Sequence, residues 1–284
     1  MSGTEELGRL LRLSRDWLAA RGVDNAAREA DELAARALGC RRLDLYLQHE
    51  RRLEGRELEE LRGLLRRRAS GEPLQYILGS QPFRRAELLV DSRVLIPRPE
   101  TEELVDLVLE REGDSTGLRV LDVGTGSGCL AISLALELPD CHVLAVDKSD
   151  AALDLARENA ARNGVAGRIE FRRLNVLTAW PEEPSELLVA NPPYVALRER
   201  SALARELGHE PAEALFGGDD GLLFYRRFAG GLAHLLAPGG RFYFEIGAEQ
   251  GEELLALFGG RCRELELRLD LAGRPRFLCG REPS

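Results

Sequence analysis

Apolar residues recur at the spacing of an α-helix through the first third of the chain. A first helix is predicted with Leu7, Leu10, Leu11, Trp17 and Leu18 on one face. A second helix is predicted between Asp24, which suits an N-cap, and Gly39, which suits a stop. A third helix carries leucines at 58, 61, 64 and 65 and ends in arginines at 66–68. Such charge runs suit the helix dipole, which favours a solvated last turn over a binding patch.

From Arg119 onward, short apolar runs alternate with helical stretches. The predicted strands are 120–123, 143–147, 169–172, 187–190 and 242–246, and the predicted helices are 129–138, 151–163 and 222–236. This alternation predicts an α/β fold in which a parallel sheet carries helices on both faces, with right-handed crossovers. Two further strands, 263–271 and 276–279, are joined by a short Gly273-Arg274-Pro275 link and should pair antiparallel.

The length of 284 residues suits two domains. Residues 83–94 alternate loosely, as in a hairpin, and lie between the helical section and the strand–helix section. We therefore expect a helical domain over 1–82 and a larger domain over 83–284 that includes this linking hairpin. A hydrophobic content of 44% and a mean hydropathy of −0.23 supply enough apolar material for a folded core.

Composition also indicates where the protein works. No run of about 18 apolar residues is present, and the acidic, amphipathic N-terminus with Glu5 and Glu6 resembles neither a signal peptide nor a transit peptide. The five cysteines form no Cys-x-x-Cys pair and the four histidines are scattered, so we expect no metal site and no disulfide framework. These features predict a cytoplasmic protein without a membrane partner. A monomer is expected because no long apolar surface stripe is left over. The net charge of −9 argues against direct nucleic-acid binding.

A glycine-rich loop follows the first strand of the predicted sheet. The strand ends in Leu121-Asp122-Val123-Gly124-Thr125-Gly126-Ser127-Gly128, and a helix follows at once. Ligands of open α/β sheets bind beyond the carboxyl ends of strands, and glycine lets the backbone approach a ligand closely. Cys129 stands where a nicotinamide fingerprint has its third glycine, and the Gly-Lys pair of a phosphate loop is absent. The loop therefore suits a sulfonium nucleoside better than a dinucleotide or a chance turn.

Asp147 ends the second predicted strand, where a carboxylate can accept hydrogen bonds from both ribose hydroxyls. Because dinucleotide enzymes place an acid at the same point, Asp147 alone does not choose the ligand.

The fourth predicted strand ends in Asn191-Pro192-Pro193-Tyr194. Prolines have no backbone donor, so this loop presents carbonyl oxygens, to which the Asn191 side chain adds an acceptor and Tyr194 adds a flat ring. The carbonyls of Asn191 and Pro192 could hold both hydrogens of a planar NH2 group while Tyr194 stacks on its face. Positioning and electrostatics would then supply most of the rate. By itself the loop leaves an amide and an adenine equally open, and a plain proline-rich turn is the remaining alternative.

Further stretches carry a resemblance to a known family. They are Pro73-Leu74-Gln75-Tyr76-Ile77-Leu78-Gly79, Ile96-Pro97-Arg98-Pro99-Glu100-Thr101-Glu102-Glu103-Leu104, Ala145-Val146-Asp147, Glu210-Pro211, Ala214-Leu215 and Asp270-Leu271-Ala272-Gly273-Arg274-Pro275-Arg276. With the glycine and proline loops, they make the chain similar to the protein N5-glutamine methyltransferases of the HemK/PrmC type, which methylate peptide-chain release factors. Adenine-N6 DNA methyltransferases share the Asn-Pro-Pro-Tyr loop alone, whereas the Arg-Pro-Glu-Thr-Glu stretch is far more specific.

The resemblance implies a seven-stranded, Rossmann-like class I methyltransferase domain that uses S-adenosylmethionine, whose last strand is antiparallel. It implies that the helical domain over 1–82 binds a class I release factor, whose Gly-Gly-Gln glutamine receives the methyl group on its side-chain amide nitrogen. The implied cofactor residues are Gly124, Thr125, Gly126, Ser127, Gly128, Asp147, Asn175, Val176 and Asn191. The implied substrate residues are Asn191, Pro192, Pro193 and Tyr194, of which Asn191, Pro192 and Tyr194 would be catalytic. Arg98, Glu100 and Thr101 would lie beside the cofactor, unless this stretch only caps a helix that opens at Glu102.

One departure from the family concerns the adenine site. After the third strand the family often has an acid followed by an aromatic residue, and this chain has Asn175 and Val176. Asparagine can still accept from or donate to the adenine edge, whereas valine offers only an apolar wall.

Three alternative functions remain at this point. A glutamine methyltransferase acting on a ribosomal protein would keep the same chemistry. An adenine-N6 nucleic-acid methyltransferase is disfavoured by the acidic balance, because base flipping needs a basic surface that faces the duplex. A non-catalytic scaffold would have no use for the glycine loop or for Asn191.

Overall fold

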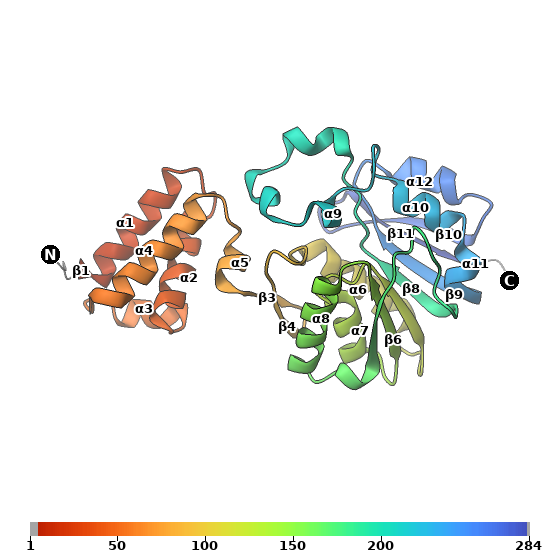
Figure 1. Cartoon of the computed structure of the whole chain (residues 1–284), viewed down its shortest axis with the longest axis horizontal. Coiled ribbons are helices and arrows are strands. Elements are labelled where there is room, and N and C mark those ends of the chain that lie inside the picture. The colour runs from red at the N-terminus through yellow and green to blue at the C-terminus, as the bar shows by residue number, and fades with distance from the viewer. Residues whose placement is uncertain (1–4, 283–284) are drawn as a thin grey trace. The chain divides into compact units, whose positions relative to one another are not determined.

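The computed structural model describes residues 5–282, which form two compact units. The helical unit contains the chain up to Gly79 together with residues 204–209, and the sheet unit contains residues 80–203 and the chain from Glu210 onward. Figure 1 draws the first part of the helical unit in red and orange. This unit ends three residues earlier than the expected domain at 82, because Ser80–Phe83 pairs as a strand within the sheet unit.

Within its described residues, the helical unit contains five α-helices. They are α1 (Leu7–Ala19), α2 (Ala26–Leu38), α3 (Arg42–Leu47), α4 (Gly55–Ala69) and α5 (Leu74–Leu78), with a short antiparallel pair of β1 (Glu5–Glu6) and β2 (Arg52–Leu53). The predicted apolar faces of α1, α2 and α4 pack into one core. Gly39 ends α2 in the left-handed conformation at φ 61°, as predicted, whereas the N-cap is Asn25 rather than Asp24. Among the described residues, no helix is long and apolar enough to span a membrane.

The end of α4 corrects the expected solvated arginine cluster. Arg68 is only 4% exposed and forms ion pairs with Glu29 of α2 and with Glu206. Glu206 belongs to the short 3-10 helix Arg205–His209, which the chain inserts into the helical unit from a much later point in the sequence. The partners of Arg68 are thus brought by folding, and no local charge pattern could reveal them.

The sheet unit contains the predicted seven-stranded sheet, in the order β10-β11-β9-β8-β5-β6-β7. The strands are β5 (Arg119–Val123), β6 (His142–Asp147), β7 (Ile169–Arg173), β8 (Ser185–Ala190), β9 (Leu236–Glu245), β10 (Arg263–Leu269) and β11 (Pro275–Arg281). The five neighbouring strands from β9 to the edge strand β7 are parallel, and β11 runs antiparallel to both β9 and β10. The predicted fold class is therefore confirmed.

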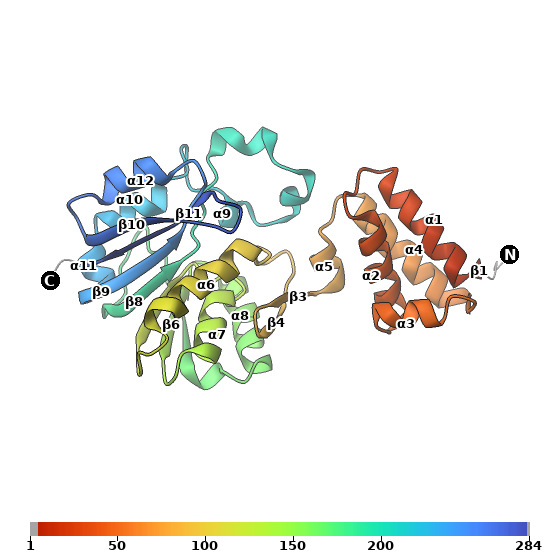
Figure 2. The same cartoon turned by 180° about the vertical axis from the view of Figure 1, so that it is seen from behind.

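Helices cover both faces of this sheet (Figures 1 and 2). One buried cluster joins α6 (Pro99–Glu112), α7 (Cys129–Glu137) and α8 (Asp150–Arg162) to the sheet, and a second joins α10 (Leu223–Ala229), α11 (Leu232–Leu235) and α12 (Gly251–Phe258) to its other face. The single helix predicted over 222–236 is wrong, because the chain breaks at Gly230 and Gly231. A Cβ on Gly231 would lie 2.3 Å from the Trp180 ring, so only glycine fits there.

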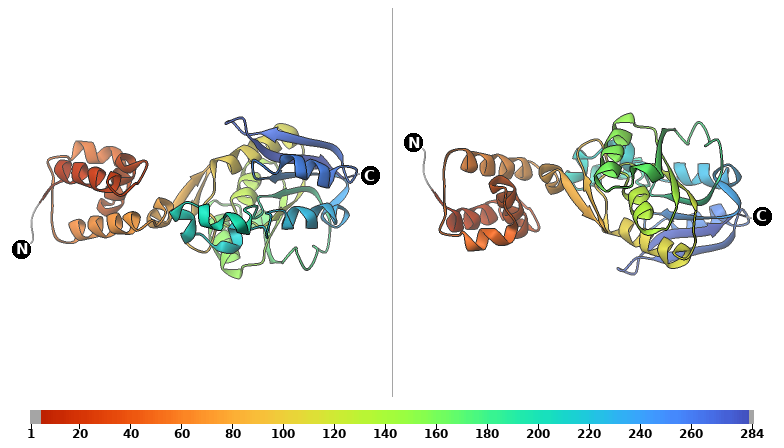
Figure 3. Two further views of the ribbon diagram at one scale, coloured as in Figure 1. Left: turned by 90° about the horizontal axis from the view of Figure 1, so that it is seen from above. Right: turned by 90° about the horizontal axis from the view of Figure 1, so that it is seen from below.

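A hairpin is present, but it lies earlier than the predicted residues 83–94, at residues 80–89, as β3 (Ser80–Phe83) and β4 (Ala86–Leu89). Its strands are seen again from above and below in Figure 3. Asn159 of α8, which is fully buried, connects this hairpin to the glycine loop. Its side-chain nitrogen donates to the carbonyls of Leu89 (3.0 Å) and Ser127 (2.9 Å), and its oxygen accepts from the Leu89 amide (2.7 Å). The linker thereby helps to hold the loop that follows β5.

Remaining short elements are η1 (Ala166–Arg168), η2 (Leu197–Ala202) and α9 (Ala212–Leu215). The last two belong to a long excursion of the chain between β8 and α10, which contributes to the site described next.

Candidate active site

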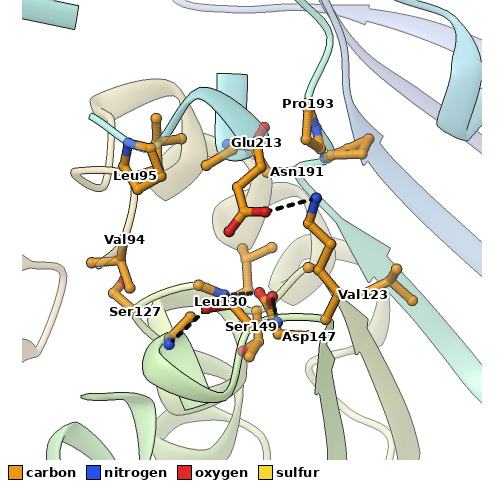
Figure 4. Close-up of a pocket in the computed structure, with 18 of the residues that line it drawn as sticks. Val94, Leu95, Val123, Ser127, Leu130, Asp147, Ser149, Asn191, Pro193 and Glu213 are labelled. Carbon is orange, nitrogen blue, oxygen red and sulfur yellow. Dashed lines mark hydrogen bonds and ion pairs between the residues drawn. The ribbon is translucent and has the colours of Figure 1, made fainter. Parts of the chain in front are cut away.

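A cavity opens at the carboxyl edge of the parallel strands, where the predicted loops meet (Figure 4). Ten predicted residues line it: Gly124, Thr125, Gly126, Ser127, Asp147, Asn175, Val176, Asn191, Pro192 and Pro193. Of the predicted residues in the glycine and proline loops, Gly128 and Tyr194 are described by the structure but do not line the cavity. Segments that are distant in sequence are therefore brought to one place by the sheet.

The glycine loop takes a conformation that side chains disfavour. Gly124, Gly126 and Gly128 have φ values of 75°, 53° and 83°, in the left-handed region. A Cβ on Gly124 would meet no atom within 4 Å, so this backbone faces open space, whereas a Cβ on Gly128 would lie 3.0 Å from Ile132. Gly124 and Gly126 thus expose backbone to the cavity, and Gly128 allows the loop to pack against α7.

A buried carboxyl fixes the turn from below. Asp122 accepts a hydrogen bond from the Thr125 hydroxyl (2.6 Å) and another from the Ala131 amide (3.2 Å). Burial raises the pKa of this side chain to about 7. Asp122 connects the strand, the loop and the first turn of α7, which gives the loop a fixed shape.

Asp147 lies at the end of β6 with both carboxylate oxygens oriented by the backbone. One oxygen accepts from the Gly126 amide (3.0 Å) and the other from the Ser149 amide (2.9 Å). Burial raises the pKa of Asp147, and these two backbone donors oppose that shift. Each carboxylate oxygen keeps a second lone pair, so the pair can still accept two hydroxyl donors from a ligand.

Asn191, directly after β8, is hydrogen-bonded to a threonine from another element. Its side-chain nitrogen donates to the Thr101 hydroxyl (3.0 Å), and that hydroxyl donates to the Glu245 carboxyl at the end of β9 (2.6 Å). Glu245 is 1% exposed, and burial raises its pKa to about 7. Three separate strand or helix ends thus converge at the loop that begins with Asn191.

Tyr194 is turned toward the same carboxyl. Its hydroxyl donates to Glu245 over a long 3.4 Å, and its backbone carbonyl accepts from the Gln250 side chain (3.0 Å). Burial raises the pKa of the Tyr194 hydroxyl, so it stays protonated. Stacking of the Tyr194 ring on a substrate remains a prediction.

Comparison with known proteins decides between the open alternatives. Residues 9–79 match the family model of the PrmC N-terminal domain, and residues 101–231 match that of the methyltransferase small domain. A release factor glutamine methyltransferase of Geobacter sulfurreducens is 40% identical over 251 residues, which cover 88% of this chain and 87% of that protein. A release factor glutamine methyltransferase of Cereibacter sphaeroides is 41% identical over 277 residues, which cover 96% of this chain and 98% of that protein. The chain belongs to the release factor glutamine methyltransferase family.

A methyltransferase structure from Pyrococcus furiosus shares the fold. It is 15% identical with a TM-score of 0.53, over 71% of this chain and 91% of that one.

S-adenosylmethionine is the methyl donor that this methyltransferase family implies, and the cavity fits it. The exposed backbone at Gly124 and Gly126 leaves room for a ligand without a steric conflict from Cβ atoms. Asp147 presents an oriented carboxylate to a ribose, and Val176, which is 4% exposed, offers an apolar wall. No phosphate-binding lysine is needed, in agreement with the glycine spacing.

Asn175 departs from the acid that this family often carries, and its geometry shows which atom is free to meet an adenine. Its side-chain oxygen accepts from the Leu177 amide (3.1 Å) and so faces its own turn. The side-chain nitrogen is the other polar atom of this amide, and an acid at the same position would carry an acceptor oxygen in its place.

Sequence reasoning missed part of the lining in this methyltransferase. Val94, Leu95 and Pro97 approach from the segment before α6, and Glu213 approaches from α9. Glu213 forms an ion pair with Lys148 (3.0 Å), the single lysine of the chain, which directly follows Asp147. In the sequence, the position of Lys148 directly after Asp147 is a signal that could have placed this lysine near the cavity.

The stretch Arg98–Thr101 at the start of α6 meets the expectation only in part. Thr101 lines the cavity, but Arg98 and Glu100 are not in its lining. Arg98 forms an ion pair with Glu210, whose carboxylate also accepts from the Ile96 amide (3.0 Å). The alternative of a helix that opens at Glu102 is wrong, because α6 begins at Pro99, with Arg98 at the N-cap.

Proposed function

We propose that this protein transfers a methyl group from S-adenosylmethionine to the side-chain amide nitrogen of the glutamine in the Gly-Gly-Gln motif of class I peptide-chain release factors. The observation that carries the proposal is the placement of Asn191, Pro192 and Pro193 in the same cavity as the glycine loop and Asp147. A methyl donor held by the glycine loop would meet an NH2 group held by the proline loop. The names of the relatives, release factor glutamine methyltransferases, support this choice of acceptor.

The residues of this chain act mainly by positioning. The side-chain oxygen of Asn191 and the carbonyl of Pro192 accept hydrogen bonds from the two N–H groups of the substrate amide. These bonds aim the amide nitrogen at the methyl donor. An amide lone pair is delocalised, so holding both hydrogens favours the pyramidal nitrogen that can attack. S-adenosylmethionine supplies an activated methyl group on a sulfonium with a good leaving group. No base is needed before attack, and the proton leaves the nitrogen afterwards.

The same proposal assigns the helical unit to binding of the release factor. It places the protein in the cytoplasm as a monomer, without direct contact to nucleic acid. The unit matched by the PrmC N-terminal domain covers residues 9–79, which is the part of the chain that a free-standing methyltransferase domain would not need.

The test is methylation of purified release factor with labelled S-adenosylmethionine, followed by mass mapping of the product. The expected result is one methyl group on the Gly-Gly-Gln glutamine, and none on a release factor in which that glutamine is replaced by alanine. Ribosomal proteins and DNA serve as competing acceptors in parallel reactions. Label on either of those acceptors, with none on the release factor, would overturn the proposal.

A further inference from the structure

Glu245 is a carboxyl group with an unusual position. It ends the central strand β9 and is 1% exposed, and no ion pair reaches it from the residues that the structure describes. Thr101, also 1% exposed, donates its hydroxyl to one oxygen of Glu245 at 2.6 Å. A carboxylate so deeply buried is unfavourable unless its hydrogen bonds compensate. Glu245 is not among the residues that line the cavity. Thr101 does line the cavity, so Glu245 can act on the site through its hydrogen bond with Thr101.

The chemistry of these groups fixes the direction of the hydrogen bonds. An ionised carboxylate only accepts, and a threonine hydroxyl has a single hydrogen, which must therefore point at Glu245. The Thr101 oxygen is then left with acceptor lone pairs alone. Its neighbour Asn191, 3.0 Å away, has to offer a donor, so the amide presents its nitrogen to Thr101.

This arrangement determines which end of the Asn191 amide remains for a substrate. With its nitrogen bound to Thr101, the side-chain oxygen is the atom left to accept an N–H bond, and the described residues provide no donor to it. The reversed amide would bring two lone pairs together at Thr101 and would present an NH2 group to the NH2 group of the acceptor. Both changes are repulsive.

We infer that Thr101 and Glu245 are positioning residues that lock the Asn191 side chain with its oxygen toward the acceptor amide. The inference rests on the proposed function, in which Asn191 holds the glutamine amide. The three residues come from α6, the end of β9 and the end of β8. The fold thus places these three residues in one chain of hydrogen bonds, in which the Glu245 carboxylate sets the orientation of the Asn191 amide.

The groups around Glu245 predict how this lock responds to pH. Tyr194 donates weakly to its second oxygen, Tyr225 of α10 donates to its backbone carbonyl (2.6 Å), and Glu100 and Arg276 contribute opposing charges. Once Glu245 is protonated it can donate to Thr101, and the hydroxyl can then donate to Asn191. The polarity of the relay is lost, so turnover should fall as the pH drops through about 7.

The first measurement compares Thr101→Val, which keeps the shape and removes the hydroxyl, with Thr101→Ser, which restores it. At saturating S-adenosylmethionine, Thr101→Val should lower kcat on the release factor by about 30-fold, roughly the loss expected for one hydrogen bond to a buried charged network. Its affinity for S-adenosylmethionine, measured by calorimetry, should stay within about threefold. Thr101→Ser should recover most of kcat, and the pH step near 7 should be absent from Thr101→Val. The exposed Thr116, in the loop before β5, gives the matched control Thr116→Val.

The second measurement does not depend on the acceptor. In a 15N-labelled protein the Asn191 side-chain NH2 signal, assigned by its absence in Asn191→Ala, should show one proton protected from exchange in the wild type and in Thr101→Ser but not in Thr101→Val. An unprotected wild-type signal, or equal losses of kcat in the valine and serine variants, would overturn the inference. Absence of wild-type methylation with a protected signal would instead refute the proposed function and leave the lock supported.

Discussion

Replacement of Asp147 by alanine tests the cofactor site most directly. The carboxylate of Asp147 is aimed into the cavity by two backbone amides, those of Gly126 at 3.0 Å and Ser149 at 2.9 Å. Alanine removes both acceptors that a ribose would use. It also leaves the Gly126 amide without its partner, which loosens the glycine loop. Binding of S-adenosylmethionine should therefore weaken, while the acceptor loop stays intact.

The size of the effect follows from the number of hydrogen bonds. Two ribose hydroxyls on one carboxylate form two hydrogen bonds to a charged group, each worth about 1.5–3 kcal/mol. Because burial has already raised the pKa of Asp147 and made its charge less favourable, the low end of that range applies. About 3 kcal/mol for the pair corresponds to roughly a 100-fold higher Kd.

Titration calorimetry with S-adenosylmethionine and S-adenosylhomocysteine measures this change. Asp154→Ala is the matched control, because Asp154 is exposed on α8, forms an ion pair with Arg157 (2.8 Å) and does not line the cavity. The control should bind both nucleosides like the wild type, and both variants should keep the wild-type circular dichroism spectrum. A Kd for Asp147→Ala within threefold of the control would remove Asp147 from the cofactor site.

Three further predictions concern the acceptor, the adenine and stability. Asn191→Ala should lower kcat by about 1,000-fold or more, while calorimetry shows S-adenosylmethionine binding within about tenfold; an equal loss of binding would contradict a role toward the acceptor amide. Asn175→Asp should tighten S-adenosylmethionine binding by about three- to tenfold, because the turn already holds one oxygen and the new one can accept from the adenine amino group; weaker binding would show that the Asn175 nitrogen donates to the ring. Raised pKa values near 7 for Asp122 and Glu245 mean that at pH 6 the folded protein holds protons that the unfolded chain has released, so the free energy of unfolding should fall as the pH rises from about 5 to 7. Urea titrations should show that fall, and in Asp122→Asn the fall should be smaller by roughly 1 kcal/mol or more. A fall in Asp122→Asn as large as that of the wild type would refute this assignment.

The sequence was sufficient to predict those parts of the fold that repeat locally. Strand–helix alternation predicted the parallel sheet, and the short link at Gly273 predicted the antiparallel pair of β10 and β11. Residues directly after a strand could also be placed, because carboxyl ends of parallel strands share one edge. For that reason Gly124, Asp147 and Asn191 were predicted to meet, and they line one cavity.

Elements were predicted less well where tertiary contacts override local preference. The break at Gly231 depends on the Trp180 ring, which lies about fifty residues earlier in the chain. Burial of Arg68 depends on Glu206, which is 138 residues away. Neither partner leaves a mark in the local pattern of apolar and polar positions.

The excursion between β8 and α10 shows most clearly why the rest of the site escaped prediction. The chain crosses between the two units after Gly79, after Leu203 and after His209, so the acceptor loop is followed by a segment that packs in the helical unit. On its return, Glu210 is bound by Arg98 and by the Ile96 amide, and Glu213 then reaches Lys148 at the cavity. Each of these contacts pairs a residue of the excursion with a residue from an earlier part of the chain. The sequence separations are far longer than the repeat of a helix or a strand, so the pattern of apolar and polar positions does not indicate them. Under the proposed function, this connection would join the residues that hold the glutamine amide to the unit that holds the rest of the release factor.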